Sequence, residues 1–424
     1  MKAWLAVVVS AGILGGLFFF LLASSREVLV TAETGNVPAS APSDSPQGAA
    51  VPETSAQSQK PVPVSGSDLP NQARLPNPPQ VVKAIYATSW SAGSPDRVAS
   101  LIDLVKRTEL NALVVDIKDY SGYAAYRMNV PEVQASGALE QLRIIRPNEL
   151  IGRLHAEGIY VIARISVFQD PILARAHPEW AVRDSQTGKP WADRKGLSWM
   201  DPAAKPVWDY NIAIARDAAS RGFDEINFDY IRFPSDGDLK TAVYPFWDDR
   251  TPQSATMREF FSYMRNELPG VVISADLFGL TTVNPDDLGI GQIIEDAYAN
   301  FDYVSPMVYP SHYAPGFLGY KNPASYPYEV VKYSMERARA RLEGTAIAAP
   351  TSTATSSTSA EPSGPAFSAK LRPWLQDFNL GTIYDGEMVE QQIRAVTEAL
   401  GGGDQFAGWL LWDPANKYVG FQDR

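Results

Sequence analysis

The sequence of 424 residues contains no cysteine, which excludes disulfide bonds, thiolate metal sites and a cysteine nucleophile. Histidine is almost as scarce, because only His155, His177 and His312 occur. A metal site built from several histidines is therefore not expected, and we predict no cofactor. The net charge is −11 and the basic residues form no continuous stripe, so the sequence argues against a nucleic acid partner.

Charge is also missing from the N-terminal segment, residues 1–25. After Lys2 the run AWLAVVVSAGILGGLFFFLLASS stays uncharged until Arg26. About 20 apolar residues are enough to cross a bilayer. We expect residues 4–23 to anchor the chain in the cell membrane, with the rest outside the cytoplasm. The alternative is a signal peptide cleaved near Ala23-Ser24-Ser25, which would make the protein secreted.

Two further segments have few large apolar residues. Residues 26–80 are rich in Pro, Ser, Ala, Gln and Gly, a composition that predicts a disordered linker. Residues 345–366 contain the run PTSTATSSTSAEPSGP and predict a disordered loop. We therefore expect one large domain, residues 81–424, which carries this insert.

Apolar runs alternate with amphipathic segments throughout this domain. Strands are predicted at 81–90, 112–119, 159–168, 225–233, 271–279, 303–310, 371–378 and 406–413. Helices are predicted at 95–108, 147–157, 205–221, 257–268, 328–343 and 389–400. This alternation predicts an α/β fold, a (β/α)8 TIM barrel. Only about ten residues follow the last strand, so the eighth helix should be incomplete.

The fourth predicted strand, FDEINFDYIRFP, is polar where a strand core should be apolar. Glu225, Asn227 and Asp229 share one phase of the strand alternation, while Ile226 and Phe228 share the other. The polar phase should face the barrel lumen, with Asp229 nearest the C-terminal mouth, where barrel active sites are built. A simpler interpretation is that Asp229 is a structural carboxylate bonded within the barrel.

Polar residues recur at the ends of the other predicted strands. The residues we expect to bind a substrate are Asp116, Lys118, Asp119, Arg164, Asn227, Arg232, Tyr309, His312, Asp377 and Trp412. Some of these residues have a simpler, structural interpretation. Lys118 suits an ion pair, and Arg164 could simply hold a carboxylate in place. Many rings also occur in the loops after the strands, and as a group they favour a glycan cleft, although individual rings can simply pack the loops.

Asp229 and Asp276 form the candidate catalytic pair. Two lumen carboxylates on neighbouring strands can cleave an acetal bond if one is protonated and the other ionised. A nearby cation, Arg164 or Arg232, would lower the pKa of one carboxylate, and mutual repulsion would raise that of the other. Asp229 would then act as nucleophile or base and Asp276 as acid/base.

Three motifs carry a resemblance to a known family: GFDEINFDYIRFP (222–234), WMDPAAKPVWDYN (199–211) and SPMVYPSHY (305–313). From Val82 to its end, the chain resembles the bacterial family named "putative glycosyl hydrolase domain", a group of barrel enzymes. The resemblance implies a TIM barrel that acts on sugars.

More remotely, GFDEINFD is similar to the fourth-strand motif of the α-amylase superfamily, whose last aspartate is the nucleophile. Asp229 matches that residue, whereas Asn227 stands where the superfamily has arginine. Asp276 is the nearest counterpart of the fifth-strand glutamate acid/base. Asp377 matches a sugar-binding aspartate of the seventh strand, but Gln376 replaces the histidine that precedes it.

The leading hypothesis is a glycoside hydrolase that cleaves an extracytoplasmic poly- or oligosaccharide. One alternative is a non-catalytic glycan-binding envelope protein, which the missing arginine at Asn227 favours. A second alternative is a metal-dependent polysaccharide deacetylase with Asp116, Asp119, Asp229 and His312 as ligands; the scarcity of histidine argues against it. The expected partners are a carbohydrate and, through the N-terminal segment, the membrane.

Overall fold

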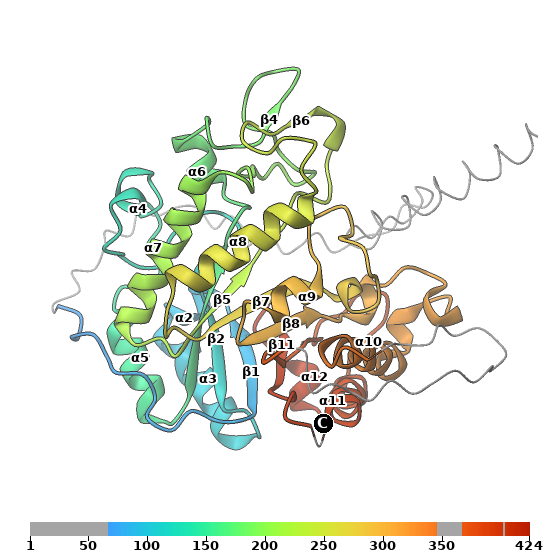
Figure 1. The fold of residues 1–424 in the computed structure, drawn as a ribbon. Coiled ribbons are helices and arrows are strands. Elements are labelled where there is room, and N and C mark those ends of the chain that lie inside the picture. The colour runs from blue at the N-terminus through green and yellow to red at the C-terminus, as the bar shows by residue number, and fades with distance from the viewer. Residues whose placement is uncertain (1–66, 346–366, 402) are drawn as a thin grey trace, which may run out of the picture.

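The structure is a computed structural model that describes residues 67–345, 367–401 and 403–424. In these residues a parallel sheet closes on itself as a barrel (Figure 1). Its strands are β1 (Val82–Ala87), β2 (Ala112–Lys118), β3 (Tyr160–Ser166), β5 (Glu225–Asp229), β7 (Ile273–Phe278), β8 (Tyr303–Met307), β9 (Lys370–Leu371), β10 (Trp374–Gln376) and β11 (Gly408–Trp412). β9 and β10 are two pieces of one barrel strand, and Trp374 opposite Met307 closes the ring. The predicted (β/α)8 barrel is confirmed.

Helices surround the strands in the described part of the chain (Figure 1). The longer ones are α3 (Pro95–Arg107), α5 (Pro147–Ala156), α7 (Lys205–Arg221), α8 (Gln253–Glu267), α10 (Pro327–Leu342) and α11 (Gly386–Leu400). Proline is in the first turn of α3, α5, α7 and α10, where its missing N–H costs nothing. The last helix, α12 (Val419–Gln422), has four residues, as the short C-terminus predicted.

Several short elements were not predicted from the sequence. They are α2 (Ser89–Ala92), α4 (Pro131–Ala135), α6 (Pro171–Ala176), α9 (Ile294–Tyr298) and the hairpin of β4 (Arg183–Asp184) with β6 (Ala242–Val243). Short 3-10 turns also lie at 239–241, 279–282, 310–312, 317–319 and 323–325. These pieces are too short to carry a readable period, and most lie in the loops that follow the barrel strands.

Side-chain alternation along the strands divides the core into two apolar clusters. The inner one fills the lumen and contains Val82, Ala84, Tyr86, Ala112, Val114, Tyr160, Ile162, Tyr309, Trp374 and Leu410. The alternate residues, such as Ile85, Leu113 and Val161, belong to the larger cluster between strands and helices. This period of two is what places the polar phase of β5 inside the barrel.

Residues 67–80 contact the barrel, although we predicted a disordered linker up to residue 80. Asp68 accepts the backbone N–H groups of Asn148 and Glu149 at the start of α5, at 3.0 and 3.1 Å. The N–H of Gln72 donates to the carbonyl of Arg221 at 3.0 Å. Gly222 has a φ of 105°, and a Cβ there would lie 2.5 Å from the Gln72 carbonyl oxygen. Leu75 also packs against the inner apolar cluster. Composition did not predict this order because hydrogen bonds to helix ends hold much of the segment.

The predicted membrane segment, residues 4–23, lies outside the described residues, as do most of the linker and residues 346–366 of the insert. Within the described ranges, no helix combines the length and apolar character needed to cross a membrane.

Candidate active site

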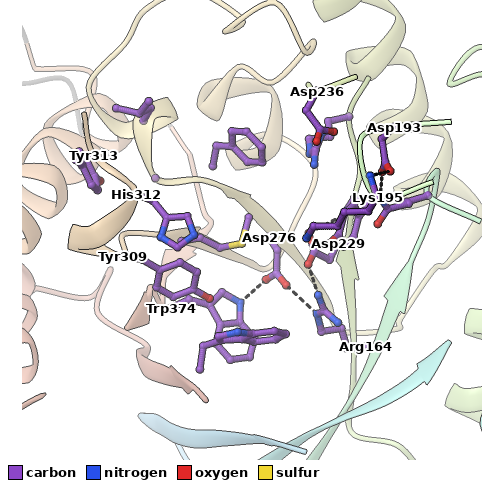
Figure 2. A pocket seen from close by; sticks show the side chains of 18 of the residues that line it. Arg164, Asp193, Lys195, Asp229, Asp236, Asp276, Tyr309, His312, Tyr313 and Trp374 are labelled. Atoms are coloured by element: carbon purple, nitrogen blue, oxygen red, sulfur yellow. Dashed lines mark hydrogen bonds and ion pairs between the residues drawn. The ribbon is translucent and has the colours of Figure 1, made fainter. Parts of the chain in front are cut away.

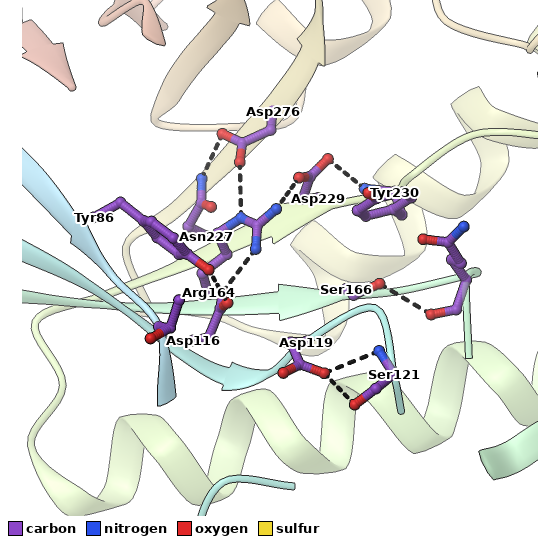
Figure 3. Close-up of polar contacts among 12 residues, drawn as sticks. Tyr86, Asp116, Asp119, Ser121, Arg164, Ser166, Asn227, Asp229, Tyr230 and Asp276 are labelled. Carbon is purple, nitrogen blue, oxygen red and sulfur yellow. Dashed lines mark hydrogen bonds and ion pairs between the residues drawn. The ribbon is translucent and has the colours of Figure 1, made fainter. Parts of the chain in front are cut away.

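Arg164, on β3, is the centre of the polar cluster in the lumen. Its guanidinium contacts three carboxylates from three neighbouring strands: Asp116 on β2, Asp229 on β5 and Asp276 on β7 (Figure 3). Its Nη1 lies 2.7 Å from Oδ1 of Asp116, and its Nε lies 3.6 Å from Oδ2 of Asp276. The guanidinium carbon also lies 5.0 Å from the ring centre of Trp412. One positive charge is therefore shared by three carboxylates. Their mutual repulsion favours protonation of at least one of them.

Asp276 is the carboxyl that the geometry favours for carrying that proton. It is 1% exposed, and its Oδ1 accepts hydrogen bonds from Asn227 Nδ2 at 2.8 Å and from Trp374 Nε1 at 2.7 Å. Burial and the negative charge of Asp229 raise the pKa of Asp276 to about 8, against the opposing effect of Arg164. Since Oδ1 already accepts two N–H groups, the proton belongs on Oδ2.

Asp229 has a different environment at the end of β5. One oxygen pairs with Nη2 of Arg164, and the other accepts the backbone N–H of Tyr230 at 2.6 Å. Tyr230 has a φ of 53°, so the chain turns sharply after the strand and leaves Asp229 at the pocket. Asp229 and Asp276 contact the same guanidinium, so the two carboxyls lie near each other, as a two-carboxylate mechanism requires.

Asn227 has a clear structural role where the α-amylase motif has arginine. Its side-chain amide donates to Ser274 Oγ at 3.0 Å as well as to Asp276, and so orients the acid. The positive charge comes instead from Arg164 on the adjacent strand, whose register places it directly opposite Asn227. The lumen therefore contains an arginine beside Asp229, supplied by β3 and not by β5.

The cluster opens into a pocket of about 310 Å³ (Figure 2). Of the predicted site residues, the pocket is lined by Arg164, Asp229, Arg232, Asp276, Tyr309, His312 and Trp412. Asp116 and Asn227 lie behind them and contact the lining through Arg164 and Asp276. The structure thus brings most of the predicted residues together at one end of the barrel.

The pocket combines flat rings with polar groups. Trp412 stacks on Tyr86 with ring centres 4.0 Å apart, and Tyr309 lies 5.3 Å from the His312 ring. The guanidinium of Arg232 lies 4.8 Å from the ring centre of Trp199. Burial, helped by the charge of Lys195, lowers the pKa of His312 to about 4, so this imidazole is neutral at pH 7.

Lys118 is not part of the pocket, contrary to our prediction. Its ammonium pairs with Asp170 at 2.7 Å, both side chains are 0% exposed, and it lies 5.4 Å from the ring centre of Tyr210 on α7. The register of β2 against β3 shifts between Asp116 and Lys118, which indicates a β-bulge. One extra residue moves Lys118 from the lumen phase to the helix side.

Asp119 and Asp377 are also outside the pocket lining. Asp119 accepts the backbone N–H of Ser121 at 2.9 Å and forms a local turn apart from the Arg164 cluster (Figure 3). Asp377 accepts the N–H groups of Gly420 and Phe421 at 3.0 and 3.1 Å, and burial raises its pKa to about 7. It holds α12 in place. The predicted substrate contacts for both residues are therefore not supported by the structure.

Sequence reasoning missed several lining residues: Gln169, Asp193, Lys195, Tyr230, Asp236, Gly279, Leu280, Met307 and Trp374. Trp374 is on β10, in the lumen phase, and strand alternation could have found it. Asp193 accepts from Gln169 Nε2 at 2.7 Å, from Trp199 Nε1 at 3.1 Å and from the backbone N–H of Lys195 at 2.9 Å. It holds together a long loop whose sequence has no periodicity that would place it.

No group of three or more His, Asp or Glu side chains is arranged to hold a metal ion within the residues described. Asp116 and Asp229 are bridged by Arg164, and Asp119 is engaged in its own turn. The four ligands named for a metal-dependent deacetylase are therefore not assembled as a metal site.

The chain folds as a TIM barrel whose lumen holds a cluster of buried acids. Residues 84–418 match the model of the family described as "Putative glycosyl hydrolase domain", and the chain belongs to this family. The expected resemblance is confirmed.

Three solved structures show the range of similarity. A hypothetical protein from Ruminiclostridium thermocellum ATCC 27405 is 39% identical over 49% of this chain and 98% of its own, with a TM-score of 0.42. The α-galactosidase TtGalA from Thermus thermophilus, in complex with stachyose, is 14% identical over 82% of this chain and 63% of its own, with a TM-score of 0.45. The glycoside hydrolase domain of PelA from Pseudomonas aeruginosa is 13% identical over 81% of this chain and 98% of its own, with a TM-score of 0.41. No curated protein matches the chain.

Proposed function

We propose that the chain is a glycoside hydrolase that cleaves glycosidic bonds by a two-carboxylate mechanism. Asp229 is the nucleophile or base and Asp276 is the acid/base. The observation that carries this proposal is the pair of unlike carboxyls at the pocket. The pKa of Asp276 is raised to about 8 by burial and by Asp229, whereas Asp229 forms an ion pair with Arg164. A protonated acid beside an ionised carboxylate is the arrangement that glycoside hydrolysis requires.

The chemistry follows from the proton on Oδ2 of Asp276. This proton passes to the glycosidic oxygen as the bond between that oxygen and the anomeric carbon breaks. Asp229 then either bonds to the anomeric carbon, for later release by water, or takes a proton from the attacking water. In both routes Arg164 balances the charge of Asp229 before the bond breaks. In the first route the hydrolytic water gives its proton to Asp276, and in the second Asp229 releases the proton it has taken to solvent, from which Asp276 is protonated again.

The rings around the site support a poly- or oligosaccharide as the substrate. Trp412 and Phe278 line the pocket and are partly exposed, so their rings can offer apolar faces to a sugar. Beyond it, Trp90 and Tyr120 follow β1 and β2, toward the barrel mouth, and are 65% and 52% exposed. Arg143 lies 4.4 Å from the Trp90 ring centre and holds that ring on one side. Together with the predicted anchor at 4–23, these rings favour an extracytoplasmic glycan.

The proposal is tested with Asp229→Asn and Asp276→Asn on a panel of bacterial envelope polysaccharides, scored by new reducing ends. Each variant should lose about 10²- to 10⁴-fold in kcat/KM. The Asp276 variant should keep most of its activity on dinitrophenyl glycosides of the same sugar, because that leaving group needs no proton. Circular dichroism checks that both variants are folded. Full activity in either variant on the natural glycan would refute the assignment.

The alternative of a non-catalytic glycan-binding barrel had its main support in the arginine missing at Asn227. Arg164 now occupies that role from the neighbouring strand, so this support is weakened. Binding on a glycan array without release of any product from the same glycans would favour the alternative.

A further inference from the structure

His312 lines the pocket from the turn that follows β8, and its hydrogen bonds determine where its proton lies. Nδ1 is 3.1 Å from Oγ of Ser311. The same hydroxyl is 2.9 Å from Oε1 of Gln376, an oxygen that can only accept. Ser311 therefore gives its one proton to Gln376 and must accept from His312. It follows that Nδ1 of His312 carries the imidazole proton.

The orientation of the Gln376 amide is fixed independently. Its Nε2 donates to the carbonyl of Phe378 at 2.9 Å, and its Oε1 also accepts the backbone N–H of Ser311 at 3.3 Å. The backbone N–H of Gln376 donates to Oε1 of Gln392 at 2.9 Å. A flipped amide would place its NH2 group against the backbone N–H of Ser311 and its oxygen against the carbonyl oxygen of Phe378. The chain of bonds from His312 through Ser311 to Gln376 therefore runs in one direction only.

The second nitrogen of His312 is left as an acceptor. Burial disfavours a second proton on the ring, and so does the charge of Lys195. The ionisable groups that share the pocket with His312 include Tyr309, whose ring is 5.3 Å away, and the carboxyls of Asp229 and Asp276. Figure 2 shows His312 and Lys195 on opposite sides of Asp276. Within the described ranges Nε2 has no hydrogen-bond partner, so its lone pair is available to a ligand.

We propose that His312 is a specificity-determining residue whose Nε2 accepts a hydrogen bond from a hydroxyl or amide N–H of the sugar bound in the pocket. Ser311 and Gln376 are positioning residues that hold the required tautomer. The identity of the ligand as a sugar rests on the proposed function, whereas the tautomer rests on the geometry alone. A sugar that presents a carboxylate or carbonyl oxygen to Nε2 would leave two acceptors facing each other and would be rejected.

The tautomer can be measured without any substrate. The full chain, labelled with ¹⁵N in the histidine rings, contains only His155, His177 and His312, so each signal is assigned with a single-residue variant, His155→Gln or His312→Gln. His177 lies between Glu132 and Glu179, which raise its pKa, and gives a contrasting reference in the same spectrum. For His312 we expect a protonated Nδ1 and an unprotonated Nε2 from pH 8 down to about pH 5. A protonated Nε2, or titration near pH 6.5, would overturn the proposal.

Two variants of Ser311 separate positioning from general damage. Ser311→Ala removes the acceptor for Nδ1 and should shift the His312 signal toward the tautomer protonated on Nε2. Ser311→Thr keeps the hydroxyl and should keep the wild-type tautomer. If the chain hydrolyses a glycan, Ser311→Ala should lower kcat/KM about tenfold, mainly through KM, and Ser311→Thr should restore it. If the spectrum shows the expected tautomer but no glycan is hydrolysed, the proposed function is refuted, whereas the assignment of His312 Nε2 as an acceptor stands. The same spectrum in Ser311→Ala and wild type would refute the positioning role.

Discussion

The barrel lumen contains two polar layers, and they differ in how charge is balanced. In the lower layer, at the start of β5 and β7, Glu225 pairs with Arg372, and both side chains are 0% exposed. Ser274 and Tyr160 complete the bonds to Glu225, at 2.5 and 3.3 Å. In the upper layer, Arg164 faces Asp116, Asp229 and Asp276. The lower layer has one acid for one base, whereas the upper layer has three acids for one base.

The balance of charge indicates that the lower layer supports the fold and that the upper layer carries the proposed reaction. A balanced, fully enclosed pair has no reason to exchange protons and serves the fold. Repulsion among several carboxylates beside an open pocket falls when one of them is protonated. The raised pKa of Asp276 indicates that this residue holds the proton.

The largest effect is expected from Arg164→Met, which removes the cation that contacts all three carboxylates of the upper layer. Activity should fall more than about a thousandfold, and the free energy of unfolding should fall by about 3–5 kcal/mol, because buried acids lose their partner. Hydrolysis assays and urea denaturation measure the two losses. Near-normal activity would mean that the upper layer is not the chemical one.

Glu225→Gln breaks the lower layer instead. It leaves the Arg372 charge buried without its carboxylate, and we expect a loss of about 3 kcal/mol in the free energy of unfolding. The variant should keep kcat within about threefold of wild type at temperatures where it is folded. Asp229→Asn is the matched upper-layer control, with the opposite pattern of retained stability and lost activity. A Glu225→Gln variant that is stable but inactive would reverse the assignment of the layers.

Stability should depend on pH through Asp276. Its folded pKa, about 8, is raised above the value of about 4 for an unfolded aspartate, so the folded chain holds a proton that the unfolded chain releases. The resulting stabilisation is complete below about pH 4 and is lost as the pH rises through about 8. Relative to Asp276→Asn, the wild type should therefore lose at least about 1 kcal/mol between pH 5 and pH 8. Urea denaturation of the two proteins at several pH values measures this loss. A difference in the free energy of unfolding that does not change with pH would contradict the prediction.

The smallest effect is expected from Asp119→Ala. Its bonds are to Ser121 in a surface turn, so activity should stay within about twofold and stability within about 1 kcal/mol. The matched change, Asp116→Ala, removes an acid that contacts Arg164 and should lower kcat/KM at least tenfold. Equal effects of the two substitutions would show that the upper layer does not include Asp116 and exclude Asp119 as we assign it.

Much of this arrangement could be predicted from the alternation of side chains along the strands. The phase of Glu225, Asn227 and Asp229 does face the lumen, and the same rule places Arg164 and Asp276 beside them. The rule works because a strand buried on both sides has no freedom to shift its phase.

The failures have local physical causes. A β-bulge after Asp116 turns Lys118 to the helix side, and a single inserted residue leaves no mark on the sequence pattern. Asp377 lies out of phase with Trp374 and Gln376, which face inward, and it holds α12. The long loop with Asp193 has no period at all, so its contribution to the pocket depends on tertiary contacts.

The account depends on Asp276 holding a proton at neutral pH while it lies beside Asp229 in the upper layer. It is tested most directly by a pH titration of the protonated-carboxyl stretching band in infrared difference spectra, with Asp276→Asn as the reference for the wild type. We predict a band, absent from the variant, that disappears with a midpoint near pH 8. A difference band with a midpoint below about pH 5 would show that Asp276 is ionised at neutral pH, and it would contradict the assignment of the acid.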